Sequence, residues 1–253
     1  MMNIIYNENC LFTMDRQEIQ NSIDLILTSP PYNTSRVGVS DDYSRRYDSY
    51  RDKLTDDQYI NWTIDVFGGF NKVLKKDGCV LYNMSYSSEN THLMWLVISD
   101  IIRNTDFIVA DCLIWKKSNA IPNNVSKNKM TRIIEYIFVF CRKSDFKTFH
   151  SNKKIVSRIQ RTGQAIYENI YNFIEAKNND GSNKLNKAVF STELVTKLLD
   201  IYGLKGGLVY DPFMGIGTTA KGAKIWGMDY IGSEISAEQV NYANEQLNDE
   251  KIN

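Results

Sequence analysis

The chain is poor in the residues that build metal sites and disulfide frameworks. It has two histidines and four cysteines in 253 residues. The cysteines, Cys10, Cys79, Cys112 and Cys141, stand singly among apolar neighbours, and none has the spacing typical of a zinc site. We therefore expect reduced cysteines packed in a protein core, no metal centre and a cytoplasmic location.

Long apolar runs and an excess of one charge are also missing. No stretch approaches the ~20 apolar residues of a membrane-spanning helix, and the N-terminus lacks the pattern of a secretion signal. We therefore expect no contact with a membrane. The net charge is zero, which argues against a surface that is basic all over, and the 43% of hydrophobic residues suits one sizeable α/β core.

The charges are nevertheless unevenly distributed. Seven basic residues and one acid lie between residues 142 and 161, and five basic residues and no acid lie between 116 and 132. These two segments flank a buried strand predicted at 133–141, in which Glu135 is the only charge. The segments are either solvated faces or the contact surface of an anionic partner. Glu135 is either a paired structural carboxylate or a residue that orients the side chains of the site without touching the ligand.

Proline is scarce too, and three of the four prolines lie in two short motifs. The apolar run 23–27 predicts a buried strand, which Ser29-Pro30-Pro31-Tyr32 ends because proline cannot donate to a sheet and fixes φ. The motif therefore forms a stiff lip at the carboxyl end of a strand, with a hydroxyl, a free carbonyl and an aromatic ring. Open α/β sheets bind their ligands at this edge.

The second motif is Asp-Pro-Phe-Met-Gly-Ile-Gly-Thr-Thr at 211–219. A strand over 207–210, this glycine turn, a helix to about 226 and a strand ending in Glu234 form half of a nucleotide-binding unit. Glycines allow the backbone to approach a ligand closely, and an acid at a strand tip can hold ribose hydroxyls. The third glycine of the dinucleotide pattern is replaced by Ala220.

Apolar spacing predicts the other elements. We expect strands over 3–6, 79–83, 108–115 and 133–141, and helices over 11–20, 55–74, 92–102, 192–202 and 237–248. Two polar segments lack a regular period: 34–53 is either a flap beside the active site or a disordered insertion, and 146–186 is a loop or small subdomain. The predicted fold class is α/β, with a doubly wound, mostly parallel Rossmann-like sheet, helices on both faces and a small insertion.

The strings Thr-Ser-Pro-Pro-Tyr and Asp-Pro-Phe-Met-Gly-Ile-Gly-Thr-Thr resemble the catalytic and cofactor motifs of the DNA amino-methyltransferases. These enzymes move a methyl group from S-adenosylmethionine to an exocyclic amine of a flipped base. The motif order resembles that of the beta class. The resemblance implies one methyltransferase domain over 1–253, with a catalytic half (1–141), a target-recognition segment (142–186) and a cofactor-binding half (187–253).

The resemblance also implies roles for single residues. Catalysis falls to Ser29, Pro30, Pro31 and Tyr32: the Ser29 hydroxyl and the Pro30 carbonyl accept hydrogen bonds from the amine, and Tyr32 stacks on the base. The cofactor residues are Asn9, Phe190, Asp211, Pro212, Phe213, Gly215, Gly217, Thr218 and Glu234. Asn9 replaces a common Asp, and Asn186-Lys187 replaces the usual His-Pro. The expected DNA contacts are Arg36, Lys117, Lys127, Lys129, Arg132, Lys153, Lys154, Arg158 and Arg161.

The methylated base has two candidates. In the family, Ser before Pro-Pro leans toward N4 of cytosine, which we expect, whereas Asn after the tyrosine, here Asn33, is frequent among N6-adenine enzymes. No Pro-Cys pair offers the nucleophile that carbon-5 methylation needs.

Two other classes of function remain as alternatives. A nicotinamide-dependent oxidoreductase would leave the proline motif and the basic segments without a role, and an inactive DNA-binding module would have no use for a cofactor pocket. The expected partner is double-stranded DNA. A restriction endonuclease partner, and a monomeric or homodimeric state, are left open.

Overall fold

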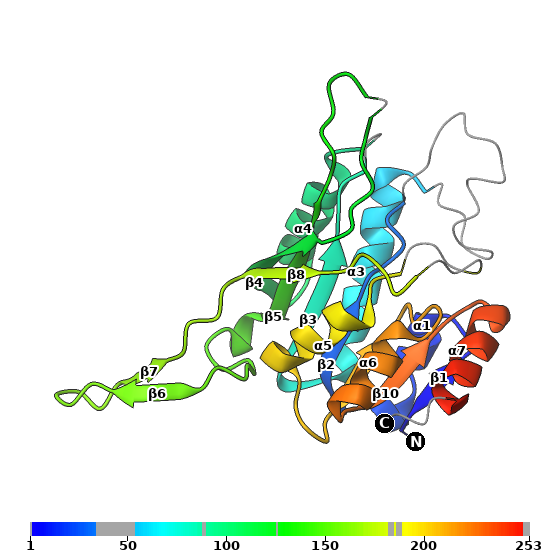
Figure 1. Ribbon diagram of the computed structural model, residues 1–253. Helices are drawn as coiled ribbons and strands as arrows, with labels where there is room; N and C mark the ends of the chain where they lie inside the picture. Colours follow the sequence, from blue (N-terminus) through cyan, green and yellow to red (C-terminus); the bar gives the residue numbers. More distant parts are fainter. Residues whose placement is uncertain are drawn as a thin grey trace.

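The computed structural model describes residues 2–33, 54–87, 90–124, 126–181, 185 and 189–249. In this part of the chain an eight-stranded sheet forms the centre, and a two-stranded hairpin projects from the body (Figure 1). From one edge to the other the sheet contains β1 (Ile4–Tyr6), β10 (Asp229–Ser233), β9 (Leu208–Asp211), β2 (Ile23–Thr28), β3 (Leu74–Met84), β5 (Ile134–Arg142), β4 (Phe107–Lys117) and β8 (Phe173–Ala176). The hairpin consists of β6 (Ile155–Arg158) and β7 (Ala165–Tyr167).

Seven of the eight strands run in one direction. β1, β10, β9, β2 and β3 pair in parallel, and β8 pairs in parallel with β4. β5 is antiparallel to both of its neighbours, β3 and β4. The mostly parallel sheet that the sequence predicts is therefore confirmed.

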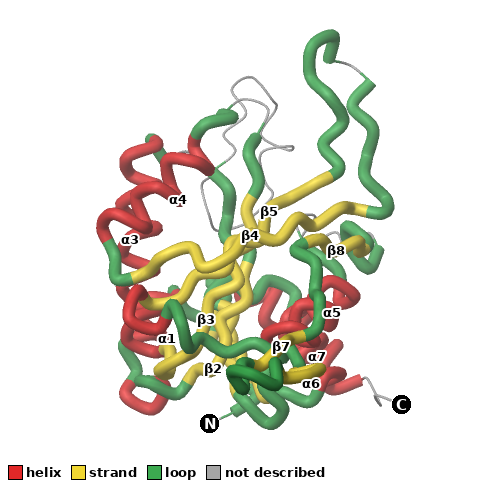
Figure 2. Tube along the Cα trace, turned by 90° about the vertical axis from the view of Figure 1, so that its left-hand side faces the viewer, coloured by secondary structure: helices red, strands yellow, loops and turns green. Residues whose placement is uncertain are grey.

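Helices cover both faces of the sheet (Figure 2). On one face are α1 (Cys10–Met14), α3 (Asp56–Val73) and α4 (Leu93–Asn104); on the other are α5 (Thr192–Tyr202), α6 (Thr218–Trp226) and α7 (Ala237–Asp249). The alternation along β2 separates the two cores, because Leu25 and Leu27 pack with α5 to α7 while Ile26 packs with α1, α3 and α4. The doubly wound arrangement is thus confirmed.

Local signals fix several of these boundaries. The Thr55 side chain accepts from the N–H of Gln58 and the Gln58 side chain accepts from the N–H of Thr55, so a complete capping box opens α3. Ser191 caps α5 in the same manner through the N–H of Leu194. For α5 the observed bounds equal the predicted 192–202.

The predicted helix 11–20 is wrong in length. α1 ends at Met14, and a separate 3₁₀ turn follows at Gln17–Ile19. Arg16 between them is extended, and the Gln20 side chain donates to the carbonyls of Met14 and Arg16. Because a side chain satisfies these carbonyls, the helix need not continue.

The segment 146–186 has more order than its sequence suggests. It contains the hairpin and β8, which extends the main sheet beside β4 with Ile174 and Ala176 turned into the core. Two buried positions are too few for a recognisable period of two.

The cysteines pack as expected from their apolar neighbours. Cys10, Cys79 and Cys141 are buried, Cys112 is half-buried, and all four are free thiols. Among the helices of the described residues, none has the length and apolar content needed to cross a bilayer.

Candidate active site

The two motifs leave neighbouring strands at the same edge of the sheet. β2 and β9 pair in parallel, with Leu25 opposite Val209 and Ile26 opposite Tyr210. At their carboxyl ends the Thr28 hydroxyl donates to Asp211 Oδ1 at 2.7 Å, in a buried bond. Tyr32 and Phe213 pack against the same apolar core. The predicted meeting of the proline motif and the glycine turn in one crevice is therefore confirmed.

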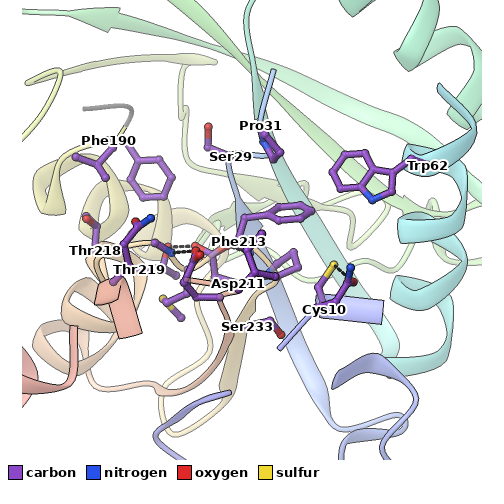
Figure 3. A pocket seen from close by; sticks show the side chains of 18 residues that line it. Cys10, Ser29, Pro31, Trp62, Phe190, Asp211, Phe213, Thr218, Thr219 and Ser233 are labelled. Carbon is purple, nitrogen blue, oxygen red and sulfur yellow. Dashed lines mark hydrogen bonds between the residues drawn. The ribbon is translucent and has the colours of Figure 1, made fainter. Parts of the chain in front are cut away.

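A cavity opens between these motifs (Figure 3). Ser29 and Pro31 from the proline motif lie above Phe213 in this view, with Phe190 on one side and Trp62 on the other. Eight of the nine residues predicted to bind the cofactor line the cavity, and Gly217 is the exception. Residues far apart in the chain therefore share one wall, as a nucleotide-sized ligand requires.

The two glycines of the turn have different tasks. Gly215 has a φ of +55°, and its N–H donates to Glu234 Oε2 at 2.9 Å. Gly217 has a φ of +90° and caps α6; a Cβ there would lie 2.9 Å from the Cβ of Ala243 in α7. Gly217 is thus needed for the close packing of α6 on α7, and only Gly215 faces the cavity.

Asp211 joins the two motifs from within the core. Its carboxylate accepts hydrogen bonds from the hydroxyls of Thr28 and Thr219 and from the N–H of Phe213. Burial raises the pKa of Asp211 to about 6, against the effect of these three hydrogen bonds. The residue borders the cavity, but its oxygens are already bonded by the chain itself.

Glu234 stands at the tip of β10, as its predicted role requires. Its Oε2 accepts from the N–H of Gly215 at 2.9 Å and its Oε1 from the N–H of Ser236 at 2.8 Å. Burial raises the pKa of Glu234, and these backbone hydrogen bonds oppose the rise. Each carboxylate oxygen has a further lone pair, so the oriented carboxylate can still accept from ribose hydroxyls. The position fits an adenosyl group.

Several hydrogen bonds hold the proline motif in place. The Tyr59 hydroxyl of α3 donates to the Pro31 carbonyl at 2.6 Å, and the Ser29 hydroxyl donates to the Tyr32 hydroxyl at 3.0 Å. Asn33, with a φ of +50°, bonds both the N–H and the carbonyl of Leu54 through its side chain. Asn33 therefore ties together the two residues that flank the segment 34–53. That segment, with Arg36 and the predicted flap, lies outside the described residues.

Several residues of the cavity wall are not among those predicted from the sequence. Trp62 of α3 lies with its ring centre 5.5 Å from that of Phe213, and its place in an ordinary helical pattern gave no signal. Ile235 and Gln239 follow Glu234 closely, so their proximity to the predicted acid could have pointed to them. Asn9, which the resemblance did suggest, accepts from the N–H of Leu11 and begins α1 at the cavity.

The basic residues predicted to contact DNA fall into two groups. Lys117 ends β4, and Lys127, Lys129 and Arg132 follow in the loop to β5, at the carboxyl edge of the parallel strands, where the cavity lies. Lys153, Lys154, Arg158 and Arg161 belong to the hairpin and its approaches, which start from the opposite edge. There the N–H of His150 donates to the Asp77 carbonyl and that of Asn152 to the Ile201 carbonyl. The structure does not bring the two groups together.

The sheet, the glycine turn and the acid at the next strand tip form a cavity that suits an adenosyl cofactor. The sequence pattern of a DNA methylase family, the N6/N4 methyltransferases, matches residues 23–245. The chain belongs to this family and is an S-adenosylmethionine-dependent DNA methyltransferase. The prediction of this class, rather than of a nicotinamide-dependent oxidoreductase, is confirmed.

Known relatives support the assignment over most of the chain. The type II methyltransferase M.BglII from Bacillus subtilis is 22% identical over 98% of this chain and 70% of its own length. The orphan methyltransferase M.BamHII from Bacillus amyloliquefaciens is 26% identical over 89% of both chains. M.MwoI from Methanothermobacter wolfeii is 31% identical over 83% of this chain but only 28% of its own length.

Solved structures share the fold. The PvuII DNA methyltransferase, described as cytosine-N4-specific, superposes with a TM-score of 0.75 at 19% identity, over 100% of this chain and 89% of that one. The complex of M1.HpyAVI with S-adenosylmethionine superposes with a TM-score of 0.63 at 21% identity, over 97% and 98% of the two chains.

Proposed function

We propose that this enzyme methylates N4 of cytosine in double-stranded DNA, after the target base has left the duplex. The observation that carries the proposal is the position of Ser29, which follows β2 and lies on the wall of the cofactor cavity. Serine at this position leans toward cytosine in the family that the motif resembles. The PvuII enzyme of the same fold is described as cytosine-N4-specific, which supports the choice.

Asn33, the residue that points toward adenine, has structural contacts in this chain. Its left-handed backbone and its two hydrogen bonds to Leu54 give it a structural task that is independent of the base. These contacts offer a reason for asparagine at this position that does not involve the base, and this supports giving more weight to Ser29.

The chain's own groups prepare the amine for reaction. An exocyclic amine is a weak nucleophile because its lone pair is delocalised into the ring. Hydrogen bonds from the amine to Ser29 Oγ and to the Pro30 carbonyl would draw the nitrogen toward a tetrahedral shape and stabilise its developing positive charge. The Tyr32 ring would stack on the flipped base and fix its orientation.

The cavity residues would hold the cofactor beside this lip. Glu234 would accept hydrogen bonds from the ribose hydroxyls, while Phe190 and Phe213 supply apolar walls. Bound S-adenosylmethionine supplies a methyl group that is activated by the positive charge on its sulfur. Pro31 and Ser29 line the same cavity, so the amine and the methyl group can meet without a covalent enzyme intermediate.

The product identifies the base. DNA methylated by the purified enzyme is digested to nucleosides and separated by chromatography. N4-methyl-2′-deoxycytidine confirms the proposal, and N6-methyl-2′-deoxyadenosine as the only product refutes it in favour of the alternative. Ser29→Ala and Tyr32→Ala should lose the activity, whereas Ser99→Ala in α4, which is not part of the cavity wall, serves as the matched control and should retain it.

We further propose Lys127, Lys129 and Arg132 as the phosphate contacts nearest the flipped base, because they lie at the edge of the sheet that carries the cavity. Relatives named type II methyltransferases support a restriction endonuclease partner. The free cysteines support a cytoplasmic location.

A further inference from the structure

The proline motif is bonded to a carboxylate on β5. The Tyr32 hydroxyl donates to Glu135 Oε2 at 3.1 Å. Asn83, near the end of β3, donates through Nδ2 to both the Tyr32 hydroxyl at 2.7 Å and Glu135 Oε2 at 2.8 Å. Lys117, at the end of β4, pairs with Glu135 Oε1 at 2.5 Å. Side chains from β3, β4 and β5 thus form one hydrogen-bonded cluster with Tyr32, which is in turn bonded to Ser29.

This cluster is shielded from solvent. The side chains of Lys117 and Glu135 are 17% and 13% exposed, and Asn83 is 3% exposed. A charge pair at this depth is more expensive to bury than a surface pair and must be held by good geometry and extra hydrogen bonds. Lys117 is therefore committed to Glu135, although its basic surroundings in the sequence suggest a contact with DNA.

The charge of Glu135 decides which groups in the cluster donate hydrogen bonds and which accept them. An ionised carboxylate can only accept, so Tyr32 must direct its proton at Glu135, and Asn83 must direct its amide nitrogen there rather than its oxygen. The Tyr32 oxygen then accepts from Asn83 and from Ser29, whose hydroxyl donates at 3.0 Å. The Ser29 proton is thereby committed to Tyr32. Ser29 Oγ also accepts a long hydrogen bond from Asn83 Nδ2 at 3.4 Å, and its second lone pair is left for a further donor.

A serine hydroxyl by itself can donate or accept, and only the accepting state helps a target amine. We propose that Glu135, acting through the Tyr32 hydroxyl, fixes Ser29 Oγ as a hydrogen-bond acceptor and is a positioning residue for methyl transfer. This inference rests on the proposed function, since it concerns the contact between Ser29 and the amine. Asn83 supports the arrangement by donating to both Tyr32 and Glu135.

The test compares Glu135→Gln and Tyr32→Phe with the wild-type enzyme. Glutamine keeps the shape but can turn its NH₂ group toward Tyr32, which reverses or breaks the chain of donors. Phenylalanine keeps the ring for stacking and removes only the hydroxyl. Each variant should lower the single-turnover rate of methyl transfer by about tenfold to a hundredfold, while the Kd values for S-adenosylmethionine and DNA stay within about twofold.

The double variant separates positioning from a general effect on the fold. If Glu135 acts through the Tyr32 hydroxyl, Glu135→Gln should add no further loss in the Tyr32→Phe background. Glu175→Gln is the matched control, because Glu175 pairs with Lys116 at 3.0 Å on the adjacent strands β4 and β8 but is exposed. It should react at the wild-type rate.

Three results would overturn the proposal. The first is a wild-type rate of methyl transfer in Glu135→Gln or in Tyr32→Phe. The second is a double variant whose fold-loss in rate equals the product of the two single losses, and the third is a loss of rate accompanied by an equally large rise in the Kd for S-adenosylmethionine. If Glu135→Gln does not fold, Tyr32→Phe alone decides, because it leaves the pair of Lys117 and Glu135 intact. A wild-type enzyme that transfers no methyl group to DNA would instead refute the proposed function.

Discussion

Replacing Asp211 with asparagine removes a buried negative charge from the junction between the two motifs. Burial sets the pKa of Asp211 at about 6 in the folded protein, compared with an ordinary value of 3.8. A carboxyl whose pKa is raised by folding favours the folded state most when it is protonated. The stability that this carboxyl contributes to the folded state therefore falls as the pH rises from about 4 to about 6, and it is fully lost above about pH 6.

The size of the effect follows from the shift. Roughly two pKa units at ~1.4 kcal/mol each give about 3 kcal/mol of stability lost between pH 4 and pH 7. Asparagine has nearly the same shape and no charge, so the variant lacks this pH-dependent loss of stability. The difference in the free energy of unfolding between wild type and Asp211→Asn should shift by about 3 kcal/mol over this range, in favour of the variant at the higher pH.

Urea unfolding at pH 4.0 and pH 7.5, followed by circular dichroism, measures this difference. Asp145 provides a control of opposite sign. Burial alone would raise the pKa of Asp145, but hydrogen bonds from Ser144 and from the N–H of Asp77, with the charge of Arg142, lower it overall. Asp145→Asn should therefore lose more stability at the higher pH. The prediction for Asp211 is refuted if the difference in the free energy of unfolding between wild type and Asp211→Asn is independent of pH, or if it changes with pH in the same direction as for Asp145→Asn.

Three further predictions concern single features of the site. Gly217→Ala should lower the free energy of unfolding by about 1–3 kcal/mol, because the new Cβ meets Ala243 at a φ of +90°; an unchanged melting temperature would contradict this. Glu234→Ala should weaken S-adenosylmethionine binding by about tenfold or more in calorimetry, since charged hydrogen bonds to the ribose are lost, while Glu238→Ala in α7, which is not part of the cavity wall, should bind normally. Replacing Lys127 and Lys129 with alanine should reduce the slope of log K for DNA against log salt by about two; the same change at Lys153 and Lys154, at the opposite edge, should reduce it less, and equal reductions would argue against the proposed phosphate contacts.

The sequence was sufficient for the features that depend on nearby residues. The bounds of α5 follow from the Ser191 cap and an apolar face that repeats at helical spacing. The end of β2 follows from two prolines. The adjacency of the two motifs could also be predicted, because parallel strands that carry ligand-binding turns share one edge of the sheet.

Features that depend on the register of distant strands could not be predicted. Asn83 and Glu135 are 52 positions apart, and their contact requires β3 to pair antiparallel with β5 in one register. Trp62 reaches the cavity only because α3 packs beside the glycine turn, and nothing in its local pattern marks it. The task of Asn33 is visible only when Leu54 is seen beside it.

The pairing of β1 with β10 has a consequence for gene design. It places the first strand of the sheet beside the last one, and α7 packs against β1. A linker from α7 to β1, with new ends cut at the hairpin tip near Gly163, would yield a circularly permuted protein that begins with β7 and β8 and carries the glycine turn ahead of the proline motif. Since the strand neighbours would be the same, the rearranged polypeptide should rebuild an identical crevice, and the order in which the two motifs are translated would not matter.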